Sequence, residues 1–191
     1  HPKFVSGQFN TGFIAEHYAK GFKAEDVPHD DHNFLAALAA FVRRKSRERA
    51  ANLTGQLRGY DVQVGSEYVV IELGAEGNNV HHAVKVSEEA GKPGVANIEV
   101  AGKTYVIESH SRLNDVRIEG TCNGKPFTAQ VERGTANNPL ALQVQHNGTR
   151  IEALVMSPRM AELHKLMPYK APPDLSKYVL SPMPGLLVDV A

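Results

Sequence analysis

The chain has 191 residues, in which 21 basic and 21 acidic side chains cancel, and a single cysteine. Balanced charge excludes the broad electrostatic field that draws proteins to nucleic acid or to anionic membranes, and one cysteine excludes an internal disulfide. No apolar run approaches the length of a membrane span, and residues 1–3 do not begin a signal peptide. We therefore expect a soluble, intracellular piece of a longer polypeptide. Its length gives room for one well-buried domain.

The first segment reads HPKFVSGQFNTGFIAEHYAKGF and contains three phenylalanines and a short amphipathic run from Thr11 to Tyr18. Thr11 is a good capping residue, so the run predicts a helix of one or two turns. A helix of that length is marginal alone. We therefore expect this segment to dock on a structure that the chain does not contain.

A long helix is predicted over residues 31–50. Asp30 and Asp31 suit the positive end of a helix. The following stretch, HNFLAALAAFV, places Phe34, Leu35, Leu38, Phe41 and Val42 at helical spacing. Alanine fills most of the other positions, which predicts burial on every side rather than one apolar face. Residues 43–49 are mostly charged, so the helix should begin inside a core and end in water.

From about residue 57 to 156 the apolar pattern alternates instead. Residues 115–119, 127–132, 143–145 and 150–155 each send apolar side chains to one face, which is typical of an antiparallel sheet wetted on the other. Asn123-Gly124 and Asn147-Gly148 are two-residue hairpin signals. Further breaks divide the region into nine segments, or eight if Gly65 is a bulge rather than a turn.

Eight consecutive antiparallel strands favour a closed up-and-down barrel, because closure removes the exposed sheet edges. The alternation points the following side chains inward: Val116, Ile118, Gly120, Ala129, Val131, Val144 and Ala153. The helix that is apolar all round can fill the interior. The predicted fold class is therefore mainly β, an eight-stranded antiparallel up-and-down β-barrel wrapped around one long α-helix.

After the barrel come three prolines in MPYKAPPD, residues 167–174, which indicate a semi-rigid spacer assigned to residues 168–178. The last residues, SPMPGLLVDVA, are turn signals followed by an apolar run. We interpret residues 179–191 as the first strand of a further domain whose other strands are absent.

Together the two ends resemble parts of the alpha subunits of biotin-dependent acyl-CoA carboxylases. HPKFVSGQFNTGFIAEHY, within residues 1–25, resembles the end of their biotin carboxylase domain, and VLSPMPGLLVDVA resembles the first strand of their biotin carboxyl carrier domain. Residues 26–167 are similar, in position and pattern, to the biotin transport domain between them. The resemblance is greatest to the enzymes acting on propionyl-CoA, while those acting on methylcrotonyl-CoA or acetyl-CoA stay open as alternatives.

The resemblance implies a connector that holds the alpha subunit, with its own biotin carboxylase and carrier domains, on a carboxyltransferase beta subunit. The complete ligase would carboxylate propionyl-CoA to methylmalonyl-CoA using ATP, Mg, bicarbonate and biotin. The Ala-Met-Lys-Met motif that carries biotin in the family does not occur in the sequence. We therefore expect this chain alone to bind no cofactor or metal and to catalyse nothing. Its compartment would be the cytoplasm in bacteria or the mitochondrial matrix in eukaryotes.

The segment between helix and barrel is the candidate partner interface. It is neither helix-periodic nor strand-alternating, and it leaves Leu53 and Leu57 available. In the family, the segment at this position forms a hook that contacts the beta subunit. By position, the resemblance gives these interface candidates: Asn52, Leu53, Thr54, Gly55, Gln56 and Leu57.

Other functional interpretations are weaker. His81 and His82 would face opposite sides of a strand, which disfavours a shared metal or acid–base site. Cys122 is expected to be a small core residue, and residues 43–49 a solvated helix end rather than a phosphate binder. A lipocalin-like carrier of a small ligand and a free-standing enzyme using the histidines are the remaining alternatives. Phosphate-loop, zinc-protease, nucleophile-elbow and dinucleotide motifs do not occur.

Overall fold

A computed structural model describes residues 2–21, 31–89, 91–135, 138–168, 176–177 and 185. The predicted spacer at 168–178 therefore lies outside the described residues except at 168 and 176–177. The predicted strand at 179–191 lies outside them except at Gly185.

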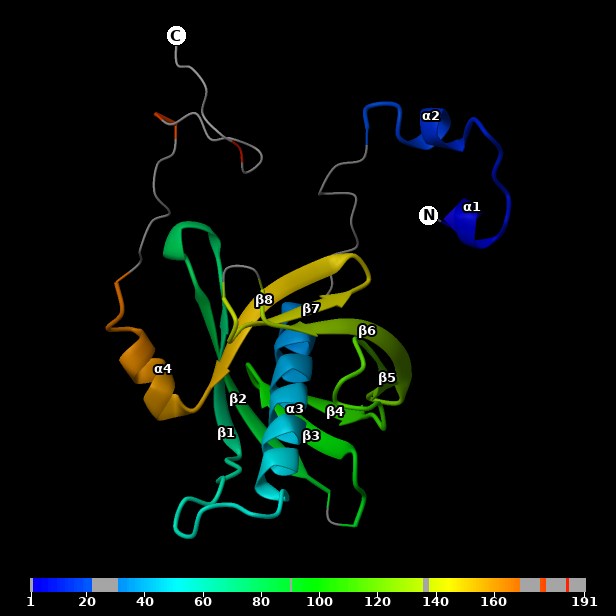
Figure 1. The fold of residues 1–191 in the computed structure, drawn as a ribbon. Coiled ribbons are helices and arrows are strands. Elements are labelled where there is room, and N and C mark those ends of the chain that lie inside the picture. The colour runs from blue at the N-terminus through cyan, green and yellow to red at the C-terminus, as the bar shows by residue number, and fades with distance from the viewer. Residues whose placement is uncertain are drawn as a thin grey trace.

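The strands form a closed barrel in which each strand pairs antiparallel with the next and β8 returns to β1. Figure 1 shows this closed ring of strands around a central helix. The eight strands are β1 Glu67–Glu72, β2 Val80–Glu88, β3 Val95–Val100, β4 Lys103–Glu108, β5 Arg117–Cys122, β6 Lys125–Arg133, β7 Leu142–His146 and β8 Thr149–Met156, with a 3-10 turn, η2, at Ala75–Gly77. The predicted fold class is confirmed.

The barrel starts later than the sequence predicted. Its first strand begins at Glu67 rather than near residue 57, so the nine-segment alternative is wrong. Residues 57–66 have no strand assignment. Part of their backbone bonds instead to side chains of the helix, as with Arg44 and the Gly65 carbonyl, 2.8 Å apart.

The long helix, α3 His32–Ala51, runs through the barrel (Figure 1). Asp31 caps it by accepting a hydrogen bond from the Asn33 backbone N–H at 3.1 Å. Residues 34–42 are all buried, and those from Leu35 to Ala40 are 0% exposed. The helix contacts β1, β2, β3, β4, β7 and β8. A helix that fills the interior contradicts the lipocalin-like alternative, which needs an open lumen.

The alanines explain how a helix fits inside so small a barrel. Their short side chains let strand residues such as Val86, Ile98 and Val144, all 0% exposed, approach the helix backbone closely. Larger side chains lie at the N-terminal end of the helix. There Phe34 packs edge-on against Phe127 at a ring separation of 5.4 Å.

Most of the predicted inward positions are correct. The buried ones are Ile118, Ala129, Val131, Val144 and Ala153. The prediction that Val116 points inward is wrong, because β5 begins only at Arg117 and the Val116 side chain is 51% exposed. Gly120 is half-buried, and a Cβ there would lie 2.1 Å from the Glu108 carbonyl oxygen. Strands β4 and β5 approach too closely at that point for any side chain.

A short helix after the barrel, α4 Pro158–His164, was not predicted. The Ser157 hydroxyl caps it by accepting from the Met160 N–H. Its one buried residue, Ala161, packs outside the barrel with Ile71 and Leu154 in a second, smaller core. α4 therefore covers the outer face of β1 and β8.

The N-terminal residues form two short helices, α1 Pro2–Val5 and α2 Phe13–His17. The helix at Phe13 was predicted, but its N-cap is Gly12 rather than Thr11. The rings of Phe4 and Phe9 stack 4.8 Å apart, and their side chains remain 58% and 51% exposed.

The buried helix gives the first prediction. Replacing Leu38, which is 0% exposed, by Asp places an unpaired carboxylate in the barrel interior and should lower the free energy of unfolding by several kcal/mol, about 3 or more. Thermal melting followed by circular dichroism measures this. Leu140→Asp, at a side chain that is 77% exposed, is the matched control and should melt near the wild type. A Leu38→Asp protein with wild-type melting would contradict a helix-filled barrel.

Candidate partner interface

The candidate interface is the connection of residues 52–66, which joins the end of α3 to the start of β1. In Figure 1 it is the cyan loop that leaves the barrel below α3. The charged end of the helix emerges at this side, so the connection begins where the buried helix meets water.

Gln56 fixes the outgoing half of the connection. Its side-chain Nε2 donates to the carbonyl oxygens of Ala50 and Ala51, both at 2.8 Å, and lies 3.2 Å from that of Leu53. Its Oε1 accepts from the Val62 N–H at 3.0 Å. Carbonyls at the end of a helix lack partners within the helix. Gln56 therefore caps α3 and ties both halves of the connection together.

Two arginines of α3 fix the returning half. Arg44 Nη1 donates to the Gly65 carbonyl at 2.8 Å, and Arg47 Nη2 donates to the Gln63 carbonyl at 3.1 Å. Charged donors form stronger hydrogen bonds than neutral ones. The charged helix end, which was predicted to be solvated, therefore also binds the backbone of the connection.

Large apolar side chains project from the connection between these two anchored ends. Leu53 is 59% exposed, Leu57 is 71% exposed and Tyr60 is 77% exposed. Neither leucine folds back to close the barrel mouth. Tyr60 is absent from the sequence-based candidates, although an aromatic residue between Gly59 and Asp61 in a stretch without periodicity was a usable signal.

The other predicted candidates differ in accessibility. Asn52, Thr54 and Gly55 are exposed, whereas Gln56 is half-buried and turned toward the helix. Gly55 has φ of +80°, a left-handed conformation that favours glycine and turns the chain between the two leucines. The structure thus separates the predicted segment into residues that are exposed, the two leucines among them, and one half-buried amide that faces the helix.

Beside the connection, Arg44 lies between two carboxylates. Its guanidinium is 2.7 Å from Glu48 and 3.4 Å from Glu88. Burial, followed by a hydrogen bond with Glu88 and repulsion from it, raises the pKa of Glu48 to about 7, although Arg44 opposes the shift. The hydrogen bond from Glu48, followed by Arg44, lowers the pKa of Glu88, against an opposing effect of burial. The pair therefore holds one proton, on Glu48, at pH values below about 7.

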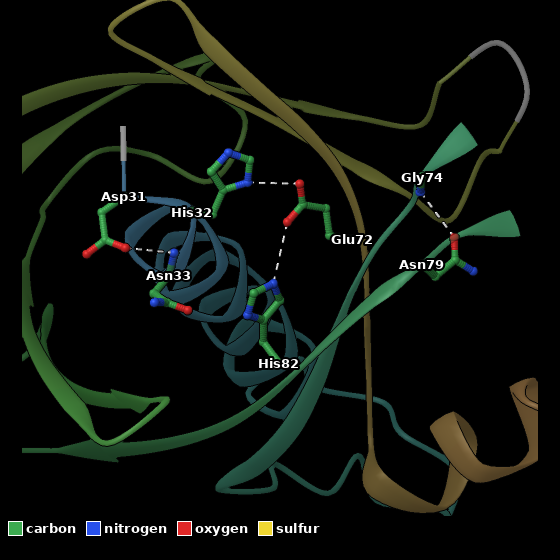
Figure 2. Close-up of polar contacts among 7 residues, drawn as sticks. All are labelled: Asp31, His32, Asn33, Glu72, Gly74, Asn79 and His82. Atoms are coloured by element: carbon green, nitrogen blue, oxygen red, sulfur yellow. Dashed lines mark hydrogen bonds and ion pairs between the residues drawn. The ribbon is translucent and has the colours of Figure 1, made fainter. Parts of the chain in front are cut away.

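A second polar cluster lies at the opposite end of α3 (Figure 2). The carboxylate of Glu72, on β1, lies 3.0 Å from His32 Nδ1 and 3.4 Å from His82 Nε2. His82 therefore faces Glu72, whereas His81 lines a pocket beside α4, so the two histidines do not share a site. Among the described residues no group of three or more His, Cys, Asp or Glu side chains could hold a metal ion.

Cys122 is half-buried and packs against the main core, and burial raises the pKa of its thiol. A thiol held in its protonated form is a poor nucleophile.

Within the described parts of the chain, no helix is long and apolar enough to cross a membrane.

Comparison with known proteins agrees with this architecture. Residues 35–170 match the profile of the family described as propionyl-coenzyme A carboxylase BT domain. The chain is 33% identical over 190 residues to the propionyl-CoA carboxylase alpha chain of Ruegeria pomeroyi, covering 100% of this chain and 26% of that protein. It is 28% identical over 197 residues to the mitochondrial propionyl-CoA carboxylase alpha chain of Mus musculus, covering 99% and 25%.

The human mitochondrial propionyl-CoA carboxylase alpha chain is 27% identical over 197 residues, again with 99% and 25% coverage. The chain thus spans about a quarter of the length of these relatives, 25 to 26%. In architecture it is a helix-filled antiparallel barrel domain. By its sequence it belongs to the propionyl-coenzyme A carboxylase BT domain family.

The shared proton at Glu48 predicts a pH dependence. Because the folded-state pKa is raised from 4.5 to about 7, its contribution to stability is fully present below 4.5 and is lost as the pH rises through 7. Glu48→Gln mimics the protonated form. Relative to the wild type, the variant should gain on the order of 1 kcal/mol of unfolding free energy at pH 8 and little at pH 4.5.

Urea unfolding at the two pH values measures the difference. Glu162→Gln is the matched control, since the Glu162 side chain is 66% exposed on α4. Equal pH dependence in the wild type and Glu48→Gln would contradict the assignment of the proton to this pair.

Proposed function

We propose that the chain is the docking and connecting domain of the alpha subunit of a propionyl-CoA carboxylase, and that the connection binds the carboxyltransferase beta subunit. One observation carries the proposal. Leu53, Leu57 and Tyr60 are all more than half exposed on a loop whose backbone is pinned from inside by Gln56, Arg44 and Arg47.

Both parts of that observation favour an interface. Exposed aliphatic and aromatic side chains gain free energy when a partner removes them from water, and a few such residues dominate most interfaces. A pinned loop loses little conformational entropy on binding, so more of that gain becomes affinity. Gln56, which was predicted from the sequence to contact the partner, is proposed instead to position the others.

The complete enzyme is proposed to carboxylate propionyl-CoA to methylmalonyl-CoA with ATP, Mg and bicarbonate, using biotin as the mobile carrier. The names of the relatives support propionyl-CoA over methylcrotonyl-CoA or acetyl-CoA. The mitochondrial relatives support the matrix as the compartment in a eukaryote, and the cytoplasm is proposed for a bacterium.

The domain's contribution to that reaction would be effective concentration. By holding the alpha subunit on its partner, it makes the encounter of a tethered carrier with the second active site intramolecular. Residues 168–178 are the proposed tether, and residues 1–25 the proposed attachment to the biotin carboxylase domain. The exposed rings of Phe4 and Phe9 fit such an attachment.

Charging the apolar side of the connection tests the docking proposal. The double change Leu53→Asp with Leu57→Asp should weaken binding of the beta subunit at least a hundredfold, which corresponds to about 1 to 2 kcal/mol or more lost per anchor. The measurement is a binding titration against purified beta subunit. Circular dichroism and melting temperature should stay near wild type, because both side chains are already exposed.

A matched control applies the same chemistry elsewhere. Leu140→Asp with Leu166→Asp changes two leucines that are 77% and 78% exposed outside the connection, and should bind normally. Unchanged binding by the Leu53 and Leu57 variant with an intact fold would remove the connection as the dock. Equal loss in both double variants would show that the effect is general charge repulsion.

The missing biotin motif gives a separate prediction. Co-expressed with a biotin ligase, the chain should remain unlabelled on a streptavidin blot, because no lysine lies in the sequence context that the ligase recognises in the family. A chain extended to include an Ala-Met-Lys-Met motif is the positive control. Labelling of the 191-residue chain would contradict the proposed role as a connector without its own carrier site.

A further inference from the structure

A pocket of about 540 Å³ lies on the outside of the barrel, next to the C-terminal end of α4. One wall contains Leu73, Leu154 and Met167. The polar side chains in its lining are Asn79, His81, Asn138, His164 and Lys165. These residues come from the β1–β2 hairpin, the segment before β7 and the end of α4, so the pocket exists only in the folded chain.

The titratable side chains that line the pocket are all bases. Burial, followed by the positive charges of Lys165, His164 and His82, lowers the pKa of His81. Like charges that gather around one hollow repel each other unless an anion lies between them. Among the lining residues there is no carboxylate.

The two asparagines add hydrogen-bond donors. Asn79 Oδ1 accepts from the Gly74 N–H at 3.1 Å, which Figure 2 shows, and Asn138 Oδ1 accepts from the Leu140 N–H at 3.0 Å. Each amide oxygen is therefore occupied by backbone. Each amide NH₂ group is left as a donor, and for neither does the described part of the chain provide a hydrogen-bond acceptor.

Three acidic side chains described on the adjoining elements, Glu72, Glu152 and Glu162, are engaged elsewhere. Glu72 contacts His32 and His82, and Glu152 accepts from the Thr135 hydroxyl at 2.7 Å. On α4, Glu162 pairs with Arg159 at 3.4 Å.

The carbonyls at the end of α4, which would repel an anion, are also occupied. Ala161 O accepts from the Lys165 N–H at 3.2 Å, and His164 O accepts from the Met167 N–H at 3.0 Å. The pocket is thus rich in donors and positive charge and poor in acceptors.

We propose that this pocket binds a small molecule bearing a phosphate or a similar tetrahedral oxyanion. Lys165, His164 and His81 would supply charge, and the NH₂ groups of Asn79 and Asn138 would supply directed hydrogen bonds. The volume of about 540 Å³ falls within the range of small-molecule sites and exceeds what one phosphate fills. The apolar wall would then contact the rest of the ligand.

The test is an NMR titration of the 191-residue chain with inorganic phosphate, following the histidine ring signals at constant ionic strength. Signals of His81 and His164, assigned with His81→Gln and His164→Gln, should shift and saturate below about 10 mM. Lys165→Gln should weaken binding about tenfold, since Lys165 lies exposed at the helix end and its loss should leave the fold intact. Lys125→Gln, at an exposed lysine outside the pocket, should bind as the wild type does.

A second arm uses sulfate, which keeps its charge between pH 5 and 8. Bound oxyanion must favour the protonated imidazoles, so sulfate should raise the pKa of His81, and its affinity should rise as the pH falls. Shifts that do not saturate, that chloride reproduces at equal ionic strength, or that persist unchanged in Lys165→Gln would overturn the proposal. Equal weakening by Lys125→Gln would also overturn it, because the effect would then be one of net charge.

Discussion

Helix α3 has no polar face along residues 34–42, and the rest of the structure depends on keeping those turns out of water. A helix packed against one face of an open sheet would leave half of its surface exposed. A closed barrel covers the helix on all sides and at the same time pairs every strand edge. The alanines permit this arrangement because only short side chains let eight strands close around a helix.

The same constraint determines where the proposed docking surface lies. Since the helix is buried, its charged residues must leave the barrel at one end, and there Arg44, Arg47 and Gln56 bind the backbone of the connection. These contacts join to the buried helix a loop on which Leu53 and Leu57 are exposed. On the proposed docking role, stability and docking would be coupled through the helix end, where Glu48, with its pKa raised to about 7, lies beside Glu88.

Periodicity predicted the barrel and helix because both are set by burial, which the pattern of apolar residues records directly. α3, at His32–Ala51, lies within one residue of the predicted 31–50 at each end. What periodicity could not show is long-range polar contact. The hydrogen bond from Arg44 to Gly65, the inward turn of Gln56 and the convergence of Lys165 on His81 join residues that the sequence alone does not place together. The inward prediction for Val116 was wrong for a different reason, because alternation gives no signal for where a strand begins.

Hydrogen–deuterium exchange of the chain, alone and with the carboxyltransferase beta subunit, tests the central claim most directly. If the connection is the dock, amides in residues 52–66 should gain protection on binding, while the buried turns of α3 stay equally protected in both states. Protection confined to other surfaces, with the connection unchanged in the bound state, would contradict the account.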